Sequence, residues 1–544
     1  VQFLKQSLPL KYSYQLDSVN AIVNHSPWKV QTLDLSETNQ FPALLLDYID
    51  KKPSLDTFYN VYPNLENAKK LIEQHANFGV EKRTVLVEAL RKQYALIDNA
   101  PDFSPLLNEN TFTVTTGHQL NIFTGPLYII YKIVTTINLA RALKKAYPEY
   151  HFIPVYWMAT EDHDFKEIAS FHLFGNTHTW TGDHTGAVGR LNPRELKSIL
   201  KEIPAQPDFF SNAYLNHNTL ADAVRAYMHE LFGKEGLISL DADDPSLKRL
   251  FLPIIQQELT APKSAEIVYE TTQRLNKMGY HTPLHAREIN LFYLVDQLRE
   301  RIVKEDQLYK VLNTEISFTE EELLALTESN PERFSPNVIL RPVYEEVILP
   351  NLAYIGGPSE VPYWLQLKDL FDAYQVPFPM LIPRNFALYI TDKQVDKLHK
   401  LKIDYKELFW DEVTLRKIYI KRHTENPLDL GAEKAEFDAM FESIRKKALE
   451  IDVTMEPAVK AKHARLSDML KQLETRIGRA EAKKHSIGIA QLLNIKNILF
   501  PHGTAQERYD NFLTFYCSDP TFVSRLFDVF DPLSFQYYLI LEKA

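Results

Sequence analysis

The stretch FTVTTGHQLNIFTGPLYIIYKIVTTINLARALKKA, residues 112–146, decides the fold. Residues 112–116 predict a short β-strand, and a polar turn at residues 117–119 separates it from a long helix whose apolar side chains recur at helical spacing. We expect Thr124 to cap this helix and Pro126 to lie in its first turn, where a missing N–H costs nothing. The stretch therefore predicts the first half of a β–α–β unit.

The boundary between this strand and its helix is a candidate anion site. Backbone N–H groups at a helix start are unpaired and point at one spot, which attracts anions. We expect the N–H groups of Thr124 and Gly125 to contact a ligand, and His118 to donate a hydrogen bond to an anionic leaving group. The alternative is a polar loop whose histidine satisfies backbone groups. The stretch contains neither a Gly-Lys-Ser/Thr phosphate loop nor a GxGxxG dinucleotide fingerprint.

A second buried strand is predicted at residues 152–159, within YHFIPVYWMATEDHDFKEI (150–168). A continuous apolar run of this kind is typical of a strand covered on both faces in a parallel sheet. It completes the β–α–β unit and ends in an acidic turn. Because ligands bind beyond the carboxyl ends of the strands in such sheets, we expect the two polar turns to lie side by side at one site.

The acidic turn carries candidate catalytic groups, Asp162 and His163, between Glu161 and Asp164. Carboxylates and imidazole bind divalent metals, orient amines or polyols, or act as general bases. The alternative is an acid-rich first helical turn that stabilises the helix dipole, which explains the acids but not the histidine.

A third turn is predicted to close the site. Residues 352–355 form a short apolar strand, and the Gly356–Gly357 pair lets the backbone approach a ligand closely. We expect Ser359 to cap a helix that runs through Phe371, with Glu360 favourable beside its N-terminal dipole.

Other residues near the third turn are ambiguous. Arg384 follows a further strand at residues 378–382 and suits a carboxylate or phosphate partner, although a surface salt bridge is the simpler explanation. Of Tyr363 and Trp364, we expect one to belong to the hydrophobic core.

Residues 433–480 carry apolar or small side chains at intervals of mainly three and four, with charged residues between them. This spacing is that of a coiled-coil seam. Pro457 interrupts the seam, so the segment is either a helical hairpin or one kinked rod.

Composition limits the class of protein. The 544-residue chain is too long for one compact core, and its net charge of −10 disfavours a dedicated nucleic-acid binder. Its one cysteine, Cys517, excludes an intrachain disulfide framework and a cysteine-based zinc site. Residues 1–17 show no signal-peptide pattern and no run of about twenty apolar residues occurs, so we expect a cytoplasmic protein with no membrane partner.

Three segments together resemble the bacillithiol biosynthesis cysteine-adding enzymes, also called cysteine ligases. They are TGHQLNIFTGPLYIIYKI (116–133), PVYWMATEDHDFKEI (154–168) and RPVYEEVILPNLAYIGGPSEVPYW (341–364). The resemblance covers nearly the whole chain. It implies an α/β fold: a Rossmann-like parallel-sheet core with inserted connecting α+β regions, and a C-terminal α-helical coiled-coil domain that pairs two protomers as a homodimer.

Pattern and resemblance together divide the chain into segments. We expect N-terminal helices and the first half of the core at residues 1–170, core elements with the inserted α+β regions at 171–335, the second half of the core at 336–387, the helical coiled-coil domain at 388–500, and a tail packing back on the protein at 501–544.

The resemblance implies a ligase that adds cysteine to glucosaminyl malate, forming an amide bond in the last step of bacillithiol biosynthesis. A carboxylate is a poor acyl donor, so ATP is the natural activator; a metal requirement stays open. The implied catalytic residues are His118, Asp162 and His163. The implied substrate- and nucleotide-binding residues are Gly117, Gln119, Thr124, Gly125, Tyr128, Glu161, Asp164, Gly356, Gly357, Ser359, Glu360, Trp364 and Arg384; no metal ligand is assigned.

Two functions of other classes stay open on the residues alone. One is a metal-dependent phosphohydrolase built on the Glu161–Asp164 turn. The other is a non-catalytic coiled-coil scaffold that binds a protein partner.

Overall fold

The computed structural model describes residues 28–75, 78–203, 205–424 and 429–542, so the segment examined for a signal peptide lies outside the described residues. At its centre is a parallel sheet with the strand order β13-β12-β2-β3-β6. The strands are β2 (Thr111–His118), β3 (His151–Met158), β6 (Ile238–Asp241), β12 (Asn351–Gly356) and β13 (Met380–Pro383). The predicted α/β class is confirmed.

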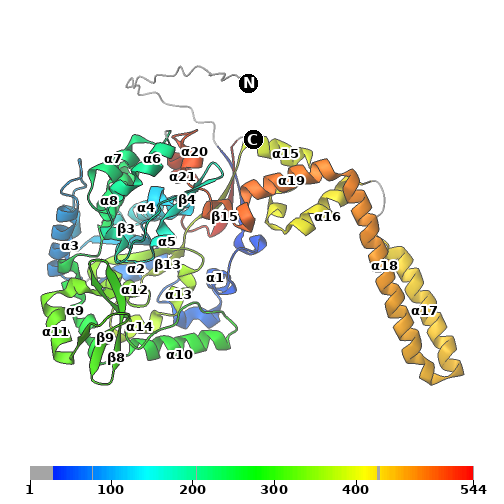
Figure 1. Cartoon of the computed structure of the whole chain (residues 1–544), viewed down its shortest axis with the longest axis horizontal. Helices are drawn as coiled ribbons and strands as arrows, with labels where there is room; N and C mark the ends of the chain where they lie inside the picture. The colour runs from blue at the N-terminus through cyan, green and yellow to red at the C-terminus, as the bar shows by residue number, and fades with distance from the viewer. Residues whose placement is uncertain (1–27, 76–77, 204, 425–428, 543–544) are drawn as a thin grey trace, which may run out of the picture.

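Helices cover both faces of this sheet (Figure 1). Because successive side chains of a strand point to opposite faces, Val155 and Trp157 of β3 pack in one core cluster and Tyr156 and Met158 in another. The first cluster includes side chains of α3 (Val80–Gln93), α9 (Pro245–Thr260) and α12 (Leu340–Ile348), and the second those of α4 (Tyr128–Ala146) and α8 (Leu220–Phe232). The β2–α4–β3 unit is the one the sequence predicts.

Two helix starts differ from the sequence prediction. α4 begins at Tyr128, and no side chain caps it. The helix expected from Ser359 through Phe371 is broken into α13 (Glu360–Leu365) and α14 (Lys368–Ala373), again without a side-chain cap from Ser359. The Ser359 backbone is already helical, with φ −97° and ψ −24°, whereas a capping residue is typically extended.

The inserted region contributes an antiparallel sheet beside the core. Its strands pair antiparallel in the order β10-β9-β8-β7-β11, and helices accompany them, as expected for an inserted α+β region. The strands are β7 (Leu291–Val295), β8 (Leu298–Glu305), β9 (Leu308–Val311), β10 (Ser317–Phe318) and β11 (Phe334–Pro336), flanked by α10 (Ser264–Lys277) and α11 (Glu320–Ser329).

A third sheet joins segments from far ends of the chain. β15 (Gln536–Leu541) pairs antiparallel with β1 (Lys29–Asp34) and parallel with β14 (Phe386–Ile390). The surrounding helices are α1 (Ala43–Ile49), α15 (Asp392–Lys400), α16 (Glu412–His423), α19 (Ser486–Leu499), α20 (Leu513–Tyr516) and α21 (Phe522–Val529). Helix α2 (Leu65–Gln74) packs instead against α4 and strands of the central sheet.

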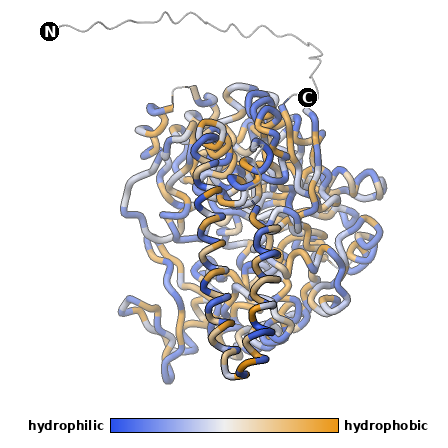
Figure 2. Tube along the Cα trace, turned by 90° about the vertical axis from the view of Figure 1, so that its right-hand side faces the viewer, coloured by the Kyte–Doolittle hydropathy of each residue, from blue (hydrophilic) through white to orange (hydrophobic). Residues whose placement is uncertain are grey.

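The coiled-coil segment is a hairpin that projects from the rest of the molecule (Figure 1). Its helices are α17 (Gly431–Ile451) and α18 (Glu456–Lys484), and Pro457 lies in the first turn of α18, where proline is tolerated. Of the two forms that the sequence allows, the hairpin is therefore the one adopted. Hydrophobic and hydrophilic residues alternate along both helices (Figure 2). None of the helices in the described segments has the length and apolar character that crossing a membrane requires.

Candidate active site

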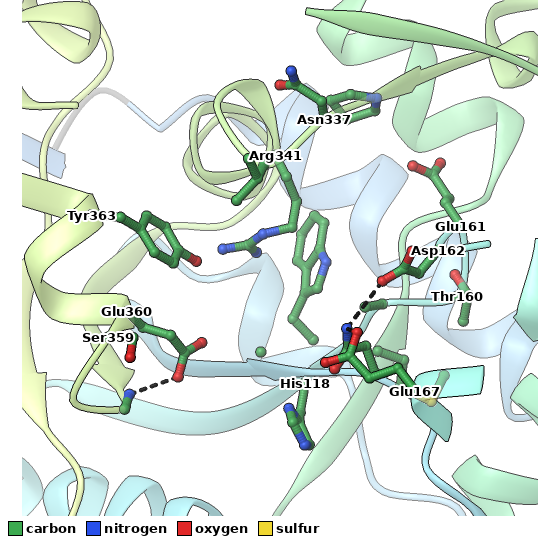
Figure 3. Close-up of a pocket in the computed structure, with 18 of the residues that line it drawn as sticks. His118, Thr160, Glu161, Asp162, Glu167, Asn337, Arg341, Ser359, Glu360 and Tyr363 are labelled. Atoms are coloured by element: carbon green, nitrogen blue, oxygen red, sulfur yellow. Dashed lines mark hydrogen bonds between the residues drawn. The ribbon is translucent and has the colours of Figure 1, made fainter. Parts of the chain in front are cut away.

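The polar turns after β2, β3 and β12 meet at the carboxyl edge of the parallel sheet, as the sequence predicts. Ala159 donates its backbone N–H to the His118 carbonyl at 3.0 Å, and the Thr116 hydroxyl donates to the Ile355 carbonyl at 2.8 Å. A cavity of about 700 Å³ lies above this edge, with His118, Asp162 and Glu360 among the residues around it (Figure 3). Residues of the inserted region, such as Arg299 and Arg301, also line it.

His118 lines the cavity as a neutral side chain. Its Nε2 lies 3.2 Å from the hydroxyl of Tyr128, in the first turn of α4. Burial, followed by the charge of the nearby Lys132 ammonium, lowers the pKa of His118 to about 3. At neutral pH the imidazole therefore carries one N–H and no charge, so it donates or accepts a hydrogen bond but is not a cationic acid.

Lys132 and Glu360 join the first turn to the third. The Lys132 ammonium is buried, 2.6 Å from the Gly117 carbonyl and 2.7 Å from Glu360 Oε2. Glu360 also accepts hydrogen bonds from the Gly357 N–H at 2.6 Å and the Tyr354 hydroxyl at 2.8 Å. Burial alone would raise the pKa of Glu360, but the charge of Lys132 and the hydrogen bonds from Lys132 and the Gly357 N–H together lower the pKa to about 2. Glu360 is thus a fixed, ionised carboxylate on the cavity wall.

Asp162 is a second fixed carboxylate on the cavity. It accepts hydrogen bonds from Gln119 Nε2 at 3.2 Å and from the His163 backbone N–H at 2.7 Å, and Gln119 also donates to Glu167 at 2.5 Å. Burial would raise the pKa of Asp162, but hydrogen bonding to His163 and the charge of Arg299 hold it well below its usual range. Asp162 therefore stays ionised.

The predicted catalytic residue His163 is not among the residues that line the cavity. Its Nδ1 lies 2.9 Å from the Arg299 guanidinium, which also donates to Ser335 Oγ at 3.1 Å and to the Pro336 carbonyl at 3.3 Å. His163 thus ties the acidic turn to the inserted sheet, because Arg299 on β8 reaches it there.

The other two acids of the turn have structural partners. Glu161 lines the cavity but is ion-paired with the buried Lys248 and accepts a hydrogen bond from Ser335 at 3.0 Å; burial raises its pKa in spite of Lys248. Asp164 lies outside the cavity lining and caps the short helix α5 (Phe165–Ile168) by accepting the Glu167 N–H at 3.2 Å. In the described part of the chain, no group of three or more His, Cys, Asp or Glu residues is arranged to hold a metal ion.

The structure places Thr124 and Gly125 away from the cavity. Phe123, Thr124 and Gly125 all have positive φ, 53°, 69° and 66°, and the Gly125 N–H donates to the Ile122 carbonyl at 2.9 Å. Asn511 donates its amide to the carbonyls of Phe123 and Gly125, at 2.7 and 2.6 Å. This loop therefore packs against the C-terminal segment instead of presenting its N–H groups to a ligand.

Two further predicted binding residues are internal. Trp364 is fully buried and stacks on Tyr354 with ring centroids 4.3 Å apart, whereas Tyr363 lines the cavity. The expectation that one of this pair is core is confirmed, with Trp364 in that position. Gly356 is also buried, and its carbonyl accepts the Arg384 N–H at 2.9 Å.

Arg384 reaches the cavity wall, but its guanidinium is already paired. It donates to both carboxylate oxygens of Glu507, at 2.7 and 3.1 Å, and both side chains are buried. The alternative reading of Arg384, a salt bridge, is therefore the one observed, although the pair is internal instead of on the surface.

Sequence reasoning missed much of the cavity lining. The missed residues include Trp157, Thr160, Glu167, Arg287, Phe292, Arg299, Arg301, Asn337, Arg341, Tyr354 and Arg508. Some of these, Arg341 and Tyr354 among them, lie in segments that carry the family resemblance. Those from the inserted sheet and from the C-terminal segment follow no local motif.

The comparisons with known proteins agree with this architecture. The N-terminal Rossmann-like domain of bacillithiol biosynthesis BshC matches residues 28–385, and the C-terminal coiled-coil domain of BshC matches residues 387–542. The chain belongs to this family. The BshC resemblance and the fold expected from it are thus confirmed.

Individual relatives carry the name "Putative cysteine ligase BshC". That of Flavobacterium psychrophilum is 43% identical over 93% of this chain and 98% of its own length, and that of Flavobacterium johnsoniae is 42% identical over 88% and 92%. The BshC protein of Chlorobaculum tepidum is 30% identical over 85% and 89%. A solved structure titled as a putative arginyl-tRNA synthetase of Campylobacter jejuni aligns over 84% of this chain and 97% of its own length at 12% identity, with a TM-score of 0.23, too low to support an argument.

Proposed function

We propose that this BshC-family protein is a ligase that adds cysteine to glucosaminyl malate, forming an amide bond between the cysteine carboxyl and the sugar amine in the last step of bacillithiol biosynthesis. The family description and the name of its relatives support the pathway and the reaction class. The observation that carries the proposal is a single cavity that holds two fixed carboxylates, Asp162 and Glu360, together with several arginines. Such a cavity suits a substrate that carries both an amine and acidic groups.

The chemistry available to these side chains is positioning more than proton transfer. A general base works best when its pKa lies near the operating pH, whereas Asp162, Glu360 and His118 all have pKa values shifted well below neutrality. Two carboxylates in fixed positions attract the amine and orient it, and the neutral His118 adds a directed hydrogen bond. We therefore assign catalysis chiefly to orientation and electrostatic complementarity.

Amide formation also needs an activated acyl group. We propose ATP as the co-substrate. The cysteine carboxylate attacks either the α-phosphorus, releasing pyrophosphate, or the γ-phosphorus, releasing ADP. The amine then attacks the activated carbonyl carbon, expels AMP or phosphate and loses a proton to solvent as the amide forms. The arginines of the cavity suit the negative charge of either the nucleotide or the malate carboxylates.

The test is direct. Purified protein supplied with cysteine, glucosaminyl malate, ATP and a divalent metal should form bacillithiol and consume nucleotide, and the release of AMP or ADP identifies the bond that is broken. Absence of product from well-folded protein would reject the proposal.

Two substitutions locate the site. His118→Ala and Asp162→Ala should remove product without lowering the thermal unfolding midpoint by more than a few degrees. Glu149→Ala is the matched control and should leave the rate unchanged, because Glu149 is exposed, lies two residues before the start of β3 and does not line the cavity. Full activity in both site variants would move the reaction elsewhere.

The proposed assembly is a homodimer formed through the α17–α18 hairpin. Its exposed apolar side chains include Met440, Ile444, Met469 and Leu473, with between 43% and 56% of their surface accessible in one chain. Side chains of this kind on a projecting hairpin are suited to a second copy. The phosphohydrolase alternative finds no comparable support, because Glu161, His163 and Asp164 each have a protein partner in the structure.

A further inference from the structure

The C-terminal domain reaches into the cavity of the Rossmann-like domain. Within the described segments, Arg508 is the one lining residue that lies beyond the boundary of the two family domains, in the second of them. It belongs to a short 3-10 turn, Gln506–Arg508, that follows α19 in the chain. This turn is held at the cavity edge by contacts on both sides of Arg508.

The residues before Arg508 are anchored by buried polar contacts. Glu507 pairs with Arg384 and accepts the Ala387 backbone N–H at 3.0 Å. Gln506 Oε1 accepts the Tyr389 backbone N–H at 3.1 Å. Both side chains are buried, so this part of the turn is fixed to strand β14.

The residues after Arg508 are anchored as well. The Asp510 carbonyl accepts the Leu127 N–H at 2.7 Å, and Asn511 holds the loop before α4. Tyr509 stacks on His172 with ring centroids 3.9 Å apart and planes only 2° from parallel. The backbone of Arg508 is thus fixed on both sides by contacts that have no need of its own side chain.

The Arg508 side chain itself is exposed to the cavity and makes no hydrogen bond or ion pair with any described residue. Its guanidinium lies 5.9 Å from the ring centroid of Tyr128, whose hydroxyl is 3.2 Å from His118 Nε2. Three other cavity arginines are occupied: Arg299 by Ser335 and Pro336, Arg341 by Glu345, and Arg384 by Glu507.

We propose that Arg508 binds an oxyanion of the ligand, a carboxylate or a phosphate, beside His118 and Tyr128. A guanidinium presents a planar fork of donors that matches such groups, and the neutral His118 and the Tyr128 hydroxyl supply uncharged hydrogen bonds next to it. The inference rests on the proposed function for the source of the anion, which is the malate carboxylates or the phosphates of the activating nucleotide. It makes the site composite, with His118 and Tyr128 contributed by the first family domain and Arg508 by the second.

Calorimetric titration of the full chain with L-malate, and separately with inorganic pyrophosphate, tests the proposal without requiring turnover. Arg508→Met should weaken binding of one of these anions by about 10- to 100-fold, the usual effect of losing a charge-assisted hydrogen-bonding partner. The anion affinity of Arg508→Lys should lie between those of the wild type and Arg508→Met, because lysine keeps the positive charge but lacks the planar fork of donors. Weakened binding of L-malate would assign the oxyanion to the malate carboxylates, and weakened binding of pyrophosphate would assign it to the nucleotide phosphates.

Arg465→Met is the matched control, since Arg465 is an exposed arginine on α18, remote from the cavity lining. It should bind both anions as the wild type does, and all three variants should keep the wild-type unfolding midpoint. Equal anion affinity in wild type and Arg508→Met overturns the inference, as does a wild type that binds neither anion.

The two proposals fail separately. If Arg508→Met makes bacillithiol with unchanged kcat and KM for every substrate, the role of Arg508 is rejected and the ligase stands. If anions bind through Arg508 but no amide forms, the ligase is rejected and the anion site stands.

Discussion

The carboxyl edge of the parallel sheet and the α17–α18 hairpin use charged residues in opposite ways. At the sheet edge, Lys132 is 1% exposed and its partner Glu360 is 26% exposed. On the hairpin, Arg445 contacts Glu442 at 2.8 Å and Glu456 at 3.0 Å, yet each of these side chains is about a third or more exposed. Ion pairs of similar length therefore differ in how much they contribute to stability. Burial makes each partner at the sheet edge indispensable, whereas solvent screens the pairs of the hairpin.

The largest expected effect comes from breaking the buried pair. Lys132→Met leaves the largely buried Glu360 carboxyl without its cation and removes the hydrogen bond to the Gly117 carbonyl. We expect a loss of about 3–5 kcal/mol of unfolding free energy, as for other buried pairs that lose one partner, together with loss of product. Urea unfolding followed by tryptophan fluorescence measures it. A Lys132→Met protein as stable as the wild type would contradict the contrast between the two regions. Lys310→Met is the control, because it removes only an exposed ion pair, that with Glu305, and should leave the unfolding free energy nearly unchanged.

The next largest effect is a pH dependence of the unfolding free energy, caused by His118 at the sheet edge. The pKa of His118 falls from 6.5 to about 3 on folding, so between these values the unfolded chain takes up a proton that the folded chain does not. The wild type should therefore lose stability as the pH falls from 6.5 toward 3, with a contribution from this group of up to about 1.4 kcal/mol per pH unit.

His118→Gln removes that contribution while keeping a hydrogen-bonding side chain. Its unfolding midpoint in urea, measured from pH 7 to pH 4, should decline less steeply than that of the wild type. Parallel declines would show that His118 is readily protonated in the folded protein, and the neutral role assigned to it would be lost.

Substitutions on the hairpin are expected to change the stability of the fold only slightly but to abolish dimerisation. The triple variant Ile444→Glu, Met469→Glu and Leu473→Glu places like charges on its exposed apolar positions. We expect the wild type to be a dimer and this variant a monomer by light scattering, with L-malate binding unchanged because no described hairpin residue lines the cavity. A variant that stays dimeric would place the subunit contact elsewhere.

The smallest effect is expected from the hairpin ion pairs. Arg445→Met removes the contacts to Glu442 and Glu456 but should leave the thermal unfolding midpoint unchanged within error, because both pairs are solvated. A shift approaching that of Lys132→Met would show that exposure does not distinguish the two regions.

Prediction from sequence succeeded where the signal is local. Buried apolar runs marked β2 and β3, and the rule that parallel strands present their carboxyl ends at one edge brought His118, Asp162 and Glu360 to a common cavity. It failed where distant segments set the geometry. The positive φ of Phe123 and Thr124 depends on Asn511, 388 residues after Phe123, and the side chain of Arg299 is placed by an inserted sheet. Neighbours such as Tyr363 and Trp364 carry similar chemistry, and only packing decides which one faces the cavity.

The Asn511 contact also bears on how the protein is made. Synthesis proceeds from the N-terminus, and the parallel sheet has left the ribosome long before the residues that clamp its first loop and supply Arg508. A nascent chain of that length holds Asp162 and Glu360 but lacks Arg508 and the Asn511 clamp. On the proposal that Arg508 binds an oxyanion of the ligand, this anion site is complete only after the second domain has docked.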